Sequence, residues 1–386
     1  MSATDFVTAV PSDGRGPRSS GPPPGSVRPA PPVTNGRLAS ALLALARAEE
    51  PGSRPASEDR AAATALRELD EDLHGRRVAL RNLPNVSPRA ADAIGSFLSS
   101  GSDDSIDDHL ASILDHHDPD DERKRDYLTV ADVSRILASG EGPSTSDLRG
   151  DVHLHTDRSD GKMTLAELHR VLQARGDAYA FLTDHARDCA VAGGLFAGDF
   201  EAERREIDRL NARTERGFTM FLGAESNIAE DGTLDVTPKR VPCLDAVIAS
   251  VHTNLRDPRD QTPRLMRALE QPGVAVLGHP RGRLYEMRSG IRADWPRVFA
   301  RARELGIAIE INGCPERLDL NPRLARQAAE SGCLFSLSSD AHARRHLDFL
   351  PFALAVARLA GIPAGRIVNA WPKDRFAAWL EERRGG

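Results

Sequence analysis

The feature that most constrains this chain is a regular alternation, from residue 147 onward, of short apolar runs with stretches whose apolar residues recur every three or four positions. The short runs predict strands at residues 151–156, 179–183, 219–223, 246–250, 274–277, 308–311 and 334–337. The longer stretches predict helices at residues 165–173, 200–210, 265–269, 295–303, 324–329, 349–359 and 375–382. Because strands that alternate with helices form parallel sheets, we predict an α/β fold, a distorted (β/α) barrel with seven strands instead of the usual eight.

A pair of histidines lies in the first of these runs. His153 and His155 are two residues apart, so both imidazoles leave the same face of a strand. Asp160 follows in a Ser-Asp-Gly turn, where its carboxylate can fold back toward the same point. A single His-x-His pair is more often an ordinary exposed or hydrogen-bonded pair than a metal site, so its interpretation depends on the residues downstream.

Further potential metal ligands follow almost every other predicted strand. They are His185, Glu225, His252, His279, Asp340 and His342. Each of these histidines, taken alone, is more simply explained as a core or loop residue. The carboxyl ends of the strands in a (β/α) barrel meet at one mouth, however, so we expect all of these side chains to converge with the first group.

The predicted cluster joins six imidazoles with three carboxylates, which exceeds what one tetrahedral ion binds. Neutral imidazoles bind zinc, manganese and iron, and carboxylates can bridge neighbouring ions and offset their charge. The cluster is therefore expected to hold several divalent ions. Neighbouring ions suit phosphoester hydrolysis, because they generate a hydroxide at neutral pH and stabilise both the attacking and the leaving oxygen.

Six segments resemble the PHP (polymerase and histidinol phosphatase) superfamily: LRGDVHLHTDRSDGK, LTDHARDCAVAGGL, IASVH, LGHPRGRL, INGCPERLDLN and SSDAH, in this order. The resemblance covers about residues 147–383 and is strongest to the PHP domain at the C-terminus of bacterial family X DNA polymerases. It implies the PHP fold, which is a TIM-like barrel, and an enzyme that hydrolyses phosphate esters. Activities of the family include 3'-5' exonucleases acting on DNA.

The resemblance also implies three divalent ions, zinc or manganese, with iron as a further option. It distributes the ligands as His153, His155, Glu225 and Asp340 for the first ion, Glu225 with His252 and His279 for the second, and Asp160, His185 and His342 for the third. A metal-bound hydroxide near Glu225 and Asp340 is expected to attack the phosphorus. Arg281 and Arg317 lie close to strand ends and are candidates to bind phosphate, with a surface salt bridge as the alternative.

The chain before this region has a different composition. Residues 1–34, rich in Pro and Gly, predict a disordered tail, residues 35–114 a small all-α domain, residues 115–146 an acidic linker and residues 147–386 the PHP domain. Segment 83–101 resembles a degenerate helix-hairpin-helix with Asn85 and Ser87 at the positions of its usual glycines. Nine acidic residues and no Lys or Arg follow at 102–122, so both DNA binding and a purely packing role stay open. A polymerase palm does not fit into residues 115–146.

Three functions are compatible with this pattern: a nuclease acting on a DNA 3' end, a phosphatase for a small phosphomonoester such as histidinol phosphate, and a scaffold with a structural metal cluster. A net charge of -6 argues against coating nucleic acid by bulk charge. No apolar run approaches the ~20 residues that span a bilayer, and the N-terminus lacks the order of a signal peptide. We expect a cytoplasmic enzyme with a phosphoester substrate, no membrane partner and no nucleotide cofactor.

Overall fold

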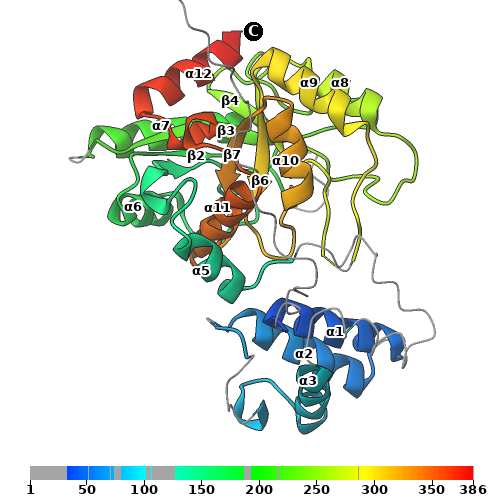
Figure 1. Cartoon of the computed structure of the whole chain (residues 1–386). Helices are drawn as coiled ribbons and strands as arrows, with labels where there is room; N and C mark the ends of the chain where they lie inside the picture. The colour runs from blue at the N-terminus through cyan, green and yellow to red at the C-terminus, as the bar shows by residue number, and fades with distance from the viewer. Residues whose placement is uncertain are drawn as a thin grey trace, which may run out of the picture.

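The computed structural model describes residues 33–50, 52–69, 71–73, 80–100, 106, 127–186, 193–214, 217–285 and 287–385. Within them, one sheet of parallel strands follows the order of the chain (Figure 1). The strands are β1 (Gly150–Asp151), β2 (Tyr179–Leu182), β3 (Thr219–Asn227), β4 (Ala246–Ser250), β5 (Val274–Gly278), β6 (Ala308–Asn312) and β7 (Leu334–Ser338). The predicted seven-stranded α/β barrel is therefore confirmed.

Helices surround this sheet. They are α6 (Leu165–Arg175), α7 (Ala197–Ala212), α8 (Thr262–Leu269), α9 (Trp295–Leu305), α10 (Pro322–Glu330), α11 (Leu350–Leu359) and α12 (Lys373–Gly385). Local sequence sets their ends: Thr164 and Glu167 form a capping box at the start of α6, and Gly176 ends this helix with φ 93°. Every helix predicted beyond residue 147 occurs, with small shifts at the ends.

Two strands differ from their predicted extents. β1 pairs with β2 only at Gly150 and Asp151. The following segment instead approaches the end of β7, where the His155 amide donates to the Ala341 carbonyl (3.0 Å). β3 continues to Asn227, because residues 223–227 are buried and pair with β4. Glu225 therefore lies within a strand and not, as predicted, after its end.

Asn369 joins the two edges of the sheet. Its Nδ2 donates to the carbonyls of Gly150 and Leu337 (2.9 Å each), and its Oδ1 accepts from the Leu337 amide (3.0 Å). Its own carbonyl accepts from the Arg149 amide (2.8 Å). Asn369 is fully buried, so these bonds nearly close the barrel between β1 and β7 in place of a ladder.

Aromatic side chains fill the end of the barrel at which the strands begin. Tyr179, the first residue of β2, stacks on Phe376 of α12 with 4.5 Å between ring centroids. Its hydroxyl donates to the Trp371 carbonyl (2.9 Å). Figure 1 shows α12 (red) at one end of the molecule and the helices of the N-terminal domain (blue) at the other. The opposite end, where the strands finish, is therefore the one that faces this domain.

The N-terminal domain consists of α1 (Asn35–Ala48), α2 (Arg54–Arg67) and α3 (Pro88–Ser100) in its described part. Buried side chains of these helices form a core that includes Leu38, Leu42, Leu66, Ile94 and Phe97. The disordered tail predicted for residues 1–34 lies outside the described residues except for its last two, of which Val33 is buried and Thr34 caps α1.

The predicted hairpin at residues 83–101 is described as far as Ser100. Asn85 has φ 62°, the left-handed conformation for which such turns use glycine, and α3 begins three residues later. The acidic run at residues 102–122 lies outside the described residues except for Ile106. Both interpretations of the hairpin, DNA binding and a purely packing role, stay open.

The predicted linker, residues 115–146, is structured where it is described. Helix α5 (Val130–Ala138) starts with a capping box of Thr129 and Asp132 and packs against α11. Arg358 of α11 donates to the carbonyls of Ile136 and Leu137 (3.0 and 2.9 Å). The predicted acidic linker thus contains an amphipathic helix that lies after its acidic residues, which are concentrated before residue 123. None of the described helices is long and apolar enough to cross a membrane.

We expect Asn369→Ala to lower the free energy of unfolding by about 3 kcal/mol, because it leaves buried backbone groups at both sheet edges without hydrogen bonds. Urea unfolding measures this change. Gln271→Ala, which removes one exposed hydrogen bond to the Arg267 carbonyl, is the control and should change stability by less than about 0.5 kcal/mol. Equal effects of the two substitutions would contradict the role of Asn369 in closing the barrel.

A second prediction concerns Glu203 of α7, which is fully buried with Arg158 Nε 3.6 Å from its Oε1. Burial, and then the neighbouring Asp184 carboxylate, raise the pKa of Glu203 well above its usual value. A carboxyl group whose pKa is higher in the folded than in the unfolded state lowers the stability of the fold once the pH rises above the unfolded-state pKa, about 4.3 for Glu. Glu203→Gln should therefore gain stability over the wild type between about pH 4 and pH 8, measured by thermal unfolding. A difference that does not change with pH would refute this explanation.

Candidate metal centre

The structure brings all nine predicted ligands to the mouth of the barrel. They are His153, His155 and Asp160 after β1, His185 after β2, Glu225 in β3, His252 after β4, His279 after β5, and Asp340 and His342 after β7. The parallel strands place these segments at one end of the sheet, although almost 190 positions separate the first from the last. Seven of them form three overlapping groups, and within each group the donor atoms lie within 4.8 Å of one another.

Glu225 is at the centre of this arrangement. Its Oε2 lies 3.0 Å from His185 Nδ1 and 3.3 Å from His153 Nε2. Its Oε1 lies 2.8 Å from His279 Nε2 and 3.2 Å from His252 Nε2. One carboxylate thus faces imidazoles from four different segments, and each of its two oxygens faces two of them.

Asp340 is the second shared carboxylate. Its Oδ1 lies 3.2 Å from His155 Nε2, 3.6 Å from His342 Nδ1 and 3.7 Å from His153 Nε2. Its Oδ2 lies 3.5 Å from Arg317 Nε. Asp340 therefore connects the predicted ligands to one of the two predicted phosphate-binding arginines.

Asp160 completes a group nearer to the solvent. Its carboxylate lies 3.3 Å from His342 Nε2, 3.7 Å from His185 Nε2 and 4.0 Å from His155 Nδ1. His155 and His185 thus each belong to two of the three groups of donor atoms. The resemblance, in contrast, assigns each of these histidines to a single ion. The distribution of ligands over individual ions stays a prediction.

Charge explains how these carboxylates remain ionised when buried. Burial alone would raise the pKa of Glu225 and of Asp340, but the surrounding imidazoles hold both pKa values well below the usual range. Burial lowers the pKa of His153, and the nearby Glu310, Glu225 and Asp340 carboxylates outweigh burial and raise it well above its usual value. The site therefore attracts positive charge strongly.

The donor atoms fit divalent cations. Both ring nitrogens of His155, Nε2 of His153, Oε1 of Glu225 and Oδ1 of Asp340 are buried and form no hydrogen bond. Buried polar atoms without hydrogen bonds are costly, and here they are nitrogen and oxygen atoms directed into one shared space. Imidazole with carboxylate is the donor set that zinc, manganese and iron accept.

Glu310 of β6 is a functional residue that the sequence pattern did not reveal. It is fully buried, and its Oε1 accepts a hydrogen bond from His153 Nδ1 (2.6 Å). This bond leaves Nε2 of His153 free to face Glu225 and Asp340. Glu310 also accepts hydrogen bonds from Ser338 and from the His279 amide. Its only sequence signal is an acidic residue inside an apolar strand, IEIN.

Asp184 is a second residue of this kind. Its carboxylate accepts hydrogen bonds from the Thr156 amide (2.7 Å), the Thr156 hydroxyl (2.5 Å) and the Ser159 hydroxyl (2.5 Å). These bonds hold the turn that carries Asp160 against the segment that carries His185. Asp184 thus orients ligands without facing the shared space itself.

Two ligands have backbones in the left-handed region. His279 has φ 21° and Asp340 has φ 53°. Such conformations cost residues other than glycine about 1–3 kcal/mol and cluster at functional sites, although aspartate tolerates them better than most. His279, whose Nε2 lies 2.8 Å from Glu225 Oε1, is therefore the more unusual of the two.

The predicted phosphate-binding arginines lie on adjacent loops. Arg281 and Arg317 follow β5 and β6, and Asp319 Oδ2 accepts hydrogen bonds from the amides of Arg281 (3.0 Å) and Arg283 (3.3 Å). Arg317 lies against Asp340, whereas the side chain of Arg281 is buried deeper in the loop. Their contact with phosphate stays a prediction.

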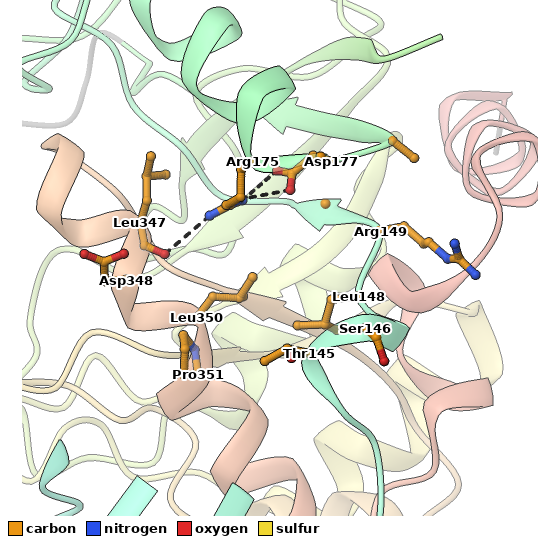
Figure 2. Close-up of a pocket in the computed structure, with 13 residues that line it drawn as sticks. Thr145, Ser146, Leu148, Arg149, Arg175, Asp177, Leu347, Asp348, Leu350 and Pro351 are labelled. Carbon is orange, nitrogen blue, oxygen red and sulfur yellow. Dashed lines mark hydrogen bonds and ion pairs between the residues drawn. The ribbon is translucent and has the colours of Figure 1, made fainter. Parts of the chain in front are cut away.

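A cavity of about 540 Å³ lies elsewhere, beside the residues that precede β1 and β2. Figure 2 shows Arg175 within it, directed toward the Asp177 carboxylate and the Leu347 carbonyl. Its lining contains none of the nine predicted ligands. The cavity is therefore separate from the candidate metal centre.

The sequence is similar to known proteins of two kinds. The DNA polymerase/3'-5' exonuclease PolX of Bacillus subtilis strain 168 is 34% identical over 261 residues, which are 67% of this chain and 45% of PolX. A probable phosphatase of Thermoanaerobacter sp. strain X514 is 29% identical over 250 residues, 61% of this chain and 95% of the phosphatase. This chain thus spans less than half the length of PolX but nearly the whole phosphatase.

No model of a protein family matches the chain. Among solved structures, the histidinol phosphate phosphatase of Lactococcus lactis in complex with zinc, L-histidinol and phosphate aligns with a TM-score of 0.43 and 18% identity, over 55% of this chain and 94% of that one. The two sequence matches each extend over more than half of the chain. The chain is accordingly a member of the PHP (polymerase and histidinol phosphatase) superfamily, close to the PHP domains of family X DNA polymerases.

Proposed function

We propose that this protein is a metal-dependent phosphoesterase. The observation that carries the proposal is the convergence of nine nitrogen- and oxygen-bearing side chains at the barrel mouth, several of them buried without hydrogen bonds. Three overlapping groups of donor atoms support a site for three ions, zinc or manganese. When bound, such ions lower the pKa of water and neutralise the charge of a phosphate ester.

The residues of the chain have separable roles in this proposal. Glu225 and Asp340 supply the negative charge that holds neighbouring cations close together, and Glu310 fixes the tautomer and orientation of His153. Arg317, beside Asp340, is placed to donate paired hydrogen bonds to phosphate oxygens on which negative charge develops. We assign the same role to Arg281 on the neighbouring loop.

Within this activity, a DNA 3' end is the first candidate substrate. Its support is the match to PolX, a relative named for 3'-5' exonuclease activity. The side chain of Phe196, next to the segment that pairs with His185 and Ala186, is 52% exposed. An exposed aromatic ring near the mouth is a surface on which an unpaired base can stack.

A small phosphomonoester is the second candidate substrate. Its support is the match to the probable phosphatase, which this chain covers over 95% of its length. That activity requires the barrel alone, whereas the N-terminal domain would then serve another purpose. A scaffold with a purely structural metal cluster is the least favoured alternative. Arg317 lies beside the candidate ligand Asp340, and a positive charge at that place would weaken the binding of cations in a purely structural site.

Two assays in parallel separate these candidates. Manganese- or zinc-loaded protein is incubated with a single-stranded oligonucleotide labelled at its 5' end and with a panel of phosphomonoesters. Stepwise 3' shortening identifies the nuclease, and release of phosphate from monoesters alone identifies the phosphatase. Absence of both reactions in metal-loaded protein would contradict the proposed phosphoesterase.

Arg317→Ala is expected to lower kcat/KM on the active substrate about 100-fold, because a hydrogen-bond donor to the developing charge is lost. Arg205→Ala is the matched control, since Arg205 is an exposed arginine of α7. The metal content of both variants is measured beside the kinetics. An Arg317→Ala enzyme as active as the control would remove Arg317 from the proposed mechanism.

Glu310→Ala is expected to weaken metal binding about 10- to 100-fold, because His153 loses the partner that orients it. Competition with a chromogenic chelator measures the affinity of the full-length protein without relying on activity. Glu330→Ala, an exposed acidic residue at the end of α10, serves as the control. Equal affinities of Glu310→Ala and wild type would show that Glu310 does not support the site.

A further inference from the structure

The N-terminal domain contacts the barrel mouth through Tyr285, in the loop between β5 and α9. The Tyr285 hydroxyl lies 2.6 Å from Ser40 Oγ of α1, and both atoms are buried. The ring of Tyr285 lies 4.5 Å from that of Tyr127, measured between centroids. Arg67, the last residue of α2, places its guanidinium carbon 3.9 Å from the Tyr127 centroid and 4.9 Å from the Tyr285 centroid.

The same loop is joined to the loop that carries Arg317. The Tyr285 amide donates to the Glu316 carbonyl (2.6 Å), and Arg283 Nε donates to the Arg317 carbonyl (2.9 Å). These bonds fix the chain on both sides of Arg317, whose Nε lies 3.5 Å from Asp340. A continuous series of contacts therefore leads from α2 through Tyr285 to the ligand cluster.

We propose that Arg67 is a positioning residue of the phosphate-binding side of the site. By holding Tyr285 against Tyr127, it fixes the two loops that present Arg281 and Arg317. The N-terminal domain is then a working part of the site although it contributes no metal ligand. This inference rests on the phosphate binding at Arg281 and Arg317 that the proposed function includes.

The chemistry of the contact supports this role. A guanidinium placed over two aromatic rings is attracted by the π electrons of both, and the attraction strengthens when the group is shielded from water. Tyr285 is only 6% exposed, and burial raises the pKa of Tyr127. Domain contacts within a chain are mobile by default unless they are large and apolar. A specific polar clamp is thus the feature that would keep this domain and the two loops in one arrangement.

A second contact restrains the same domain. Arg135 of α5 forms an ion pair with Asp72 (2.5 Å), and Asp72 also accepts a hydrogen bond from the Asn35 amide at the start of α1 (2.7 Å). Arg135 is more than half exposed, so we expect this pair to contribute less than the clamp. The ion pair between Arg135 and Asp72 keeps the N-terminal domain attached to the barrel when Arg67 is substituted. An effect of an Arg67 substitution on phosphate binding therefore reports the position of the two loops and not a loss of folding.

The test measures how tightly manganese-loaded, full-length protein binds inorganic phosphate, by isothermal titration calorimetry. Arg67→Ala should raise the dissociation constant about tenfold with unchanged metal content. Arg67→Lys keeps the charge and should recover part of the affinity. Arg60→Ala, an exposed arginine on the same helix, should match the wild type. Hydrogen exchange of residues 281–285 and 314–319 should become faster in Arg67→Ala only.

Tyr285→Phe is a second variant, which keeps the ring and removes only the hydroxyl that meets Ser40, and it should weaken phosphate binding by a smaller factor. An unchanged dissociation constant in Arg67→Ala, or an equal loss in Arg60→Ala, would overturn the inference. Wild-type protein that binds phosphate but hydrolyses no ester would refute the proposed function and leave this inference standing. Wild-type protein that hydrolyses an ester but binds no phosphate would overturn this inference and leave the proposed function standing.

Discussion

The structure of the mouth depends on a buried carboxylate that is surrounded by imidazoles. Glu225 has four histidine nitrogens within 3.3 Å of its two oxygens, and burial would strongly disfavour its charge in their absence. Bringing these groups together costs desolvation of every member. Bound cations would offset this cost, because they coordinate buried nitrogen and oxygen atoms at the same time. Nearly every other feature of the mouth serves to hold this group in place.

The barrel supplies that support from outside the cluster. Parallel strands in chain order deliver one ligand segment after another to the same end, while α12 and its aromatic residues fill the other end. Asn369 keeps β1 close to β7, so the ligands that follow these two strands can meet although no ladder joins the strands. Glu310 and Asp184 then set the direction of individual side chains. The positions of the candidate ligands thus depend on residues outside the cluster.

Periodicity and residue type were sufficient to predict the barrel and to place nine candidate metal ligands at its mouth. His279 and Asp340, for example, could be placed because each follows a recognisable apolar run, and the run fixes the end of the barrel to which they belong. Glu310 and Asn369 could not be predicted in the same way. Their importance comes from partners about 30 to more than 200 positions away, and local sequence carries no information about such contacts. The position of α5 was missed because the acidic residues before it dominated the composition of the segment.

The N-terminal domain contacts a loop at the mouth of the barrel. Arg67 and Ser40 reach Tyr285, and Tyr285 is bonded to the loop of Arg317, so the domain meets the barrel at its functional end. The two domains therefore meet beside the loop that carries Arg317. The chain is similar both to the DNA polymerase/3'-5' exonuclease PolX and to a probable phosphatase.

The most direct test of the account is the metal content of purified, dialysed full-length protein, measured by elemental analysis beside a Glu225→Ala variant. The account predicts more than one zinc or manganese ion per wild-type chain and the loss of more than one ion on removal of the shared carboxylate. One ion or fewer in the wild type, or an unchanged content in Glu225→Ala, would contradict a cluster of cations held around Glu225.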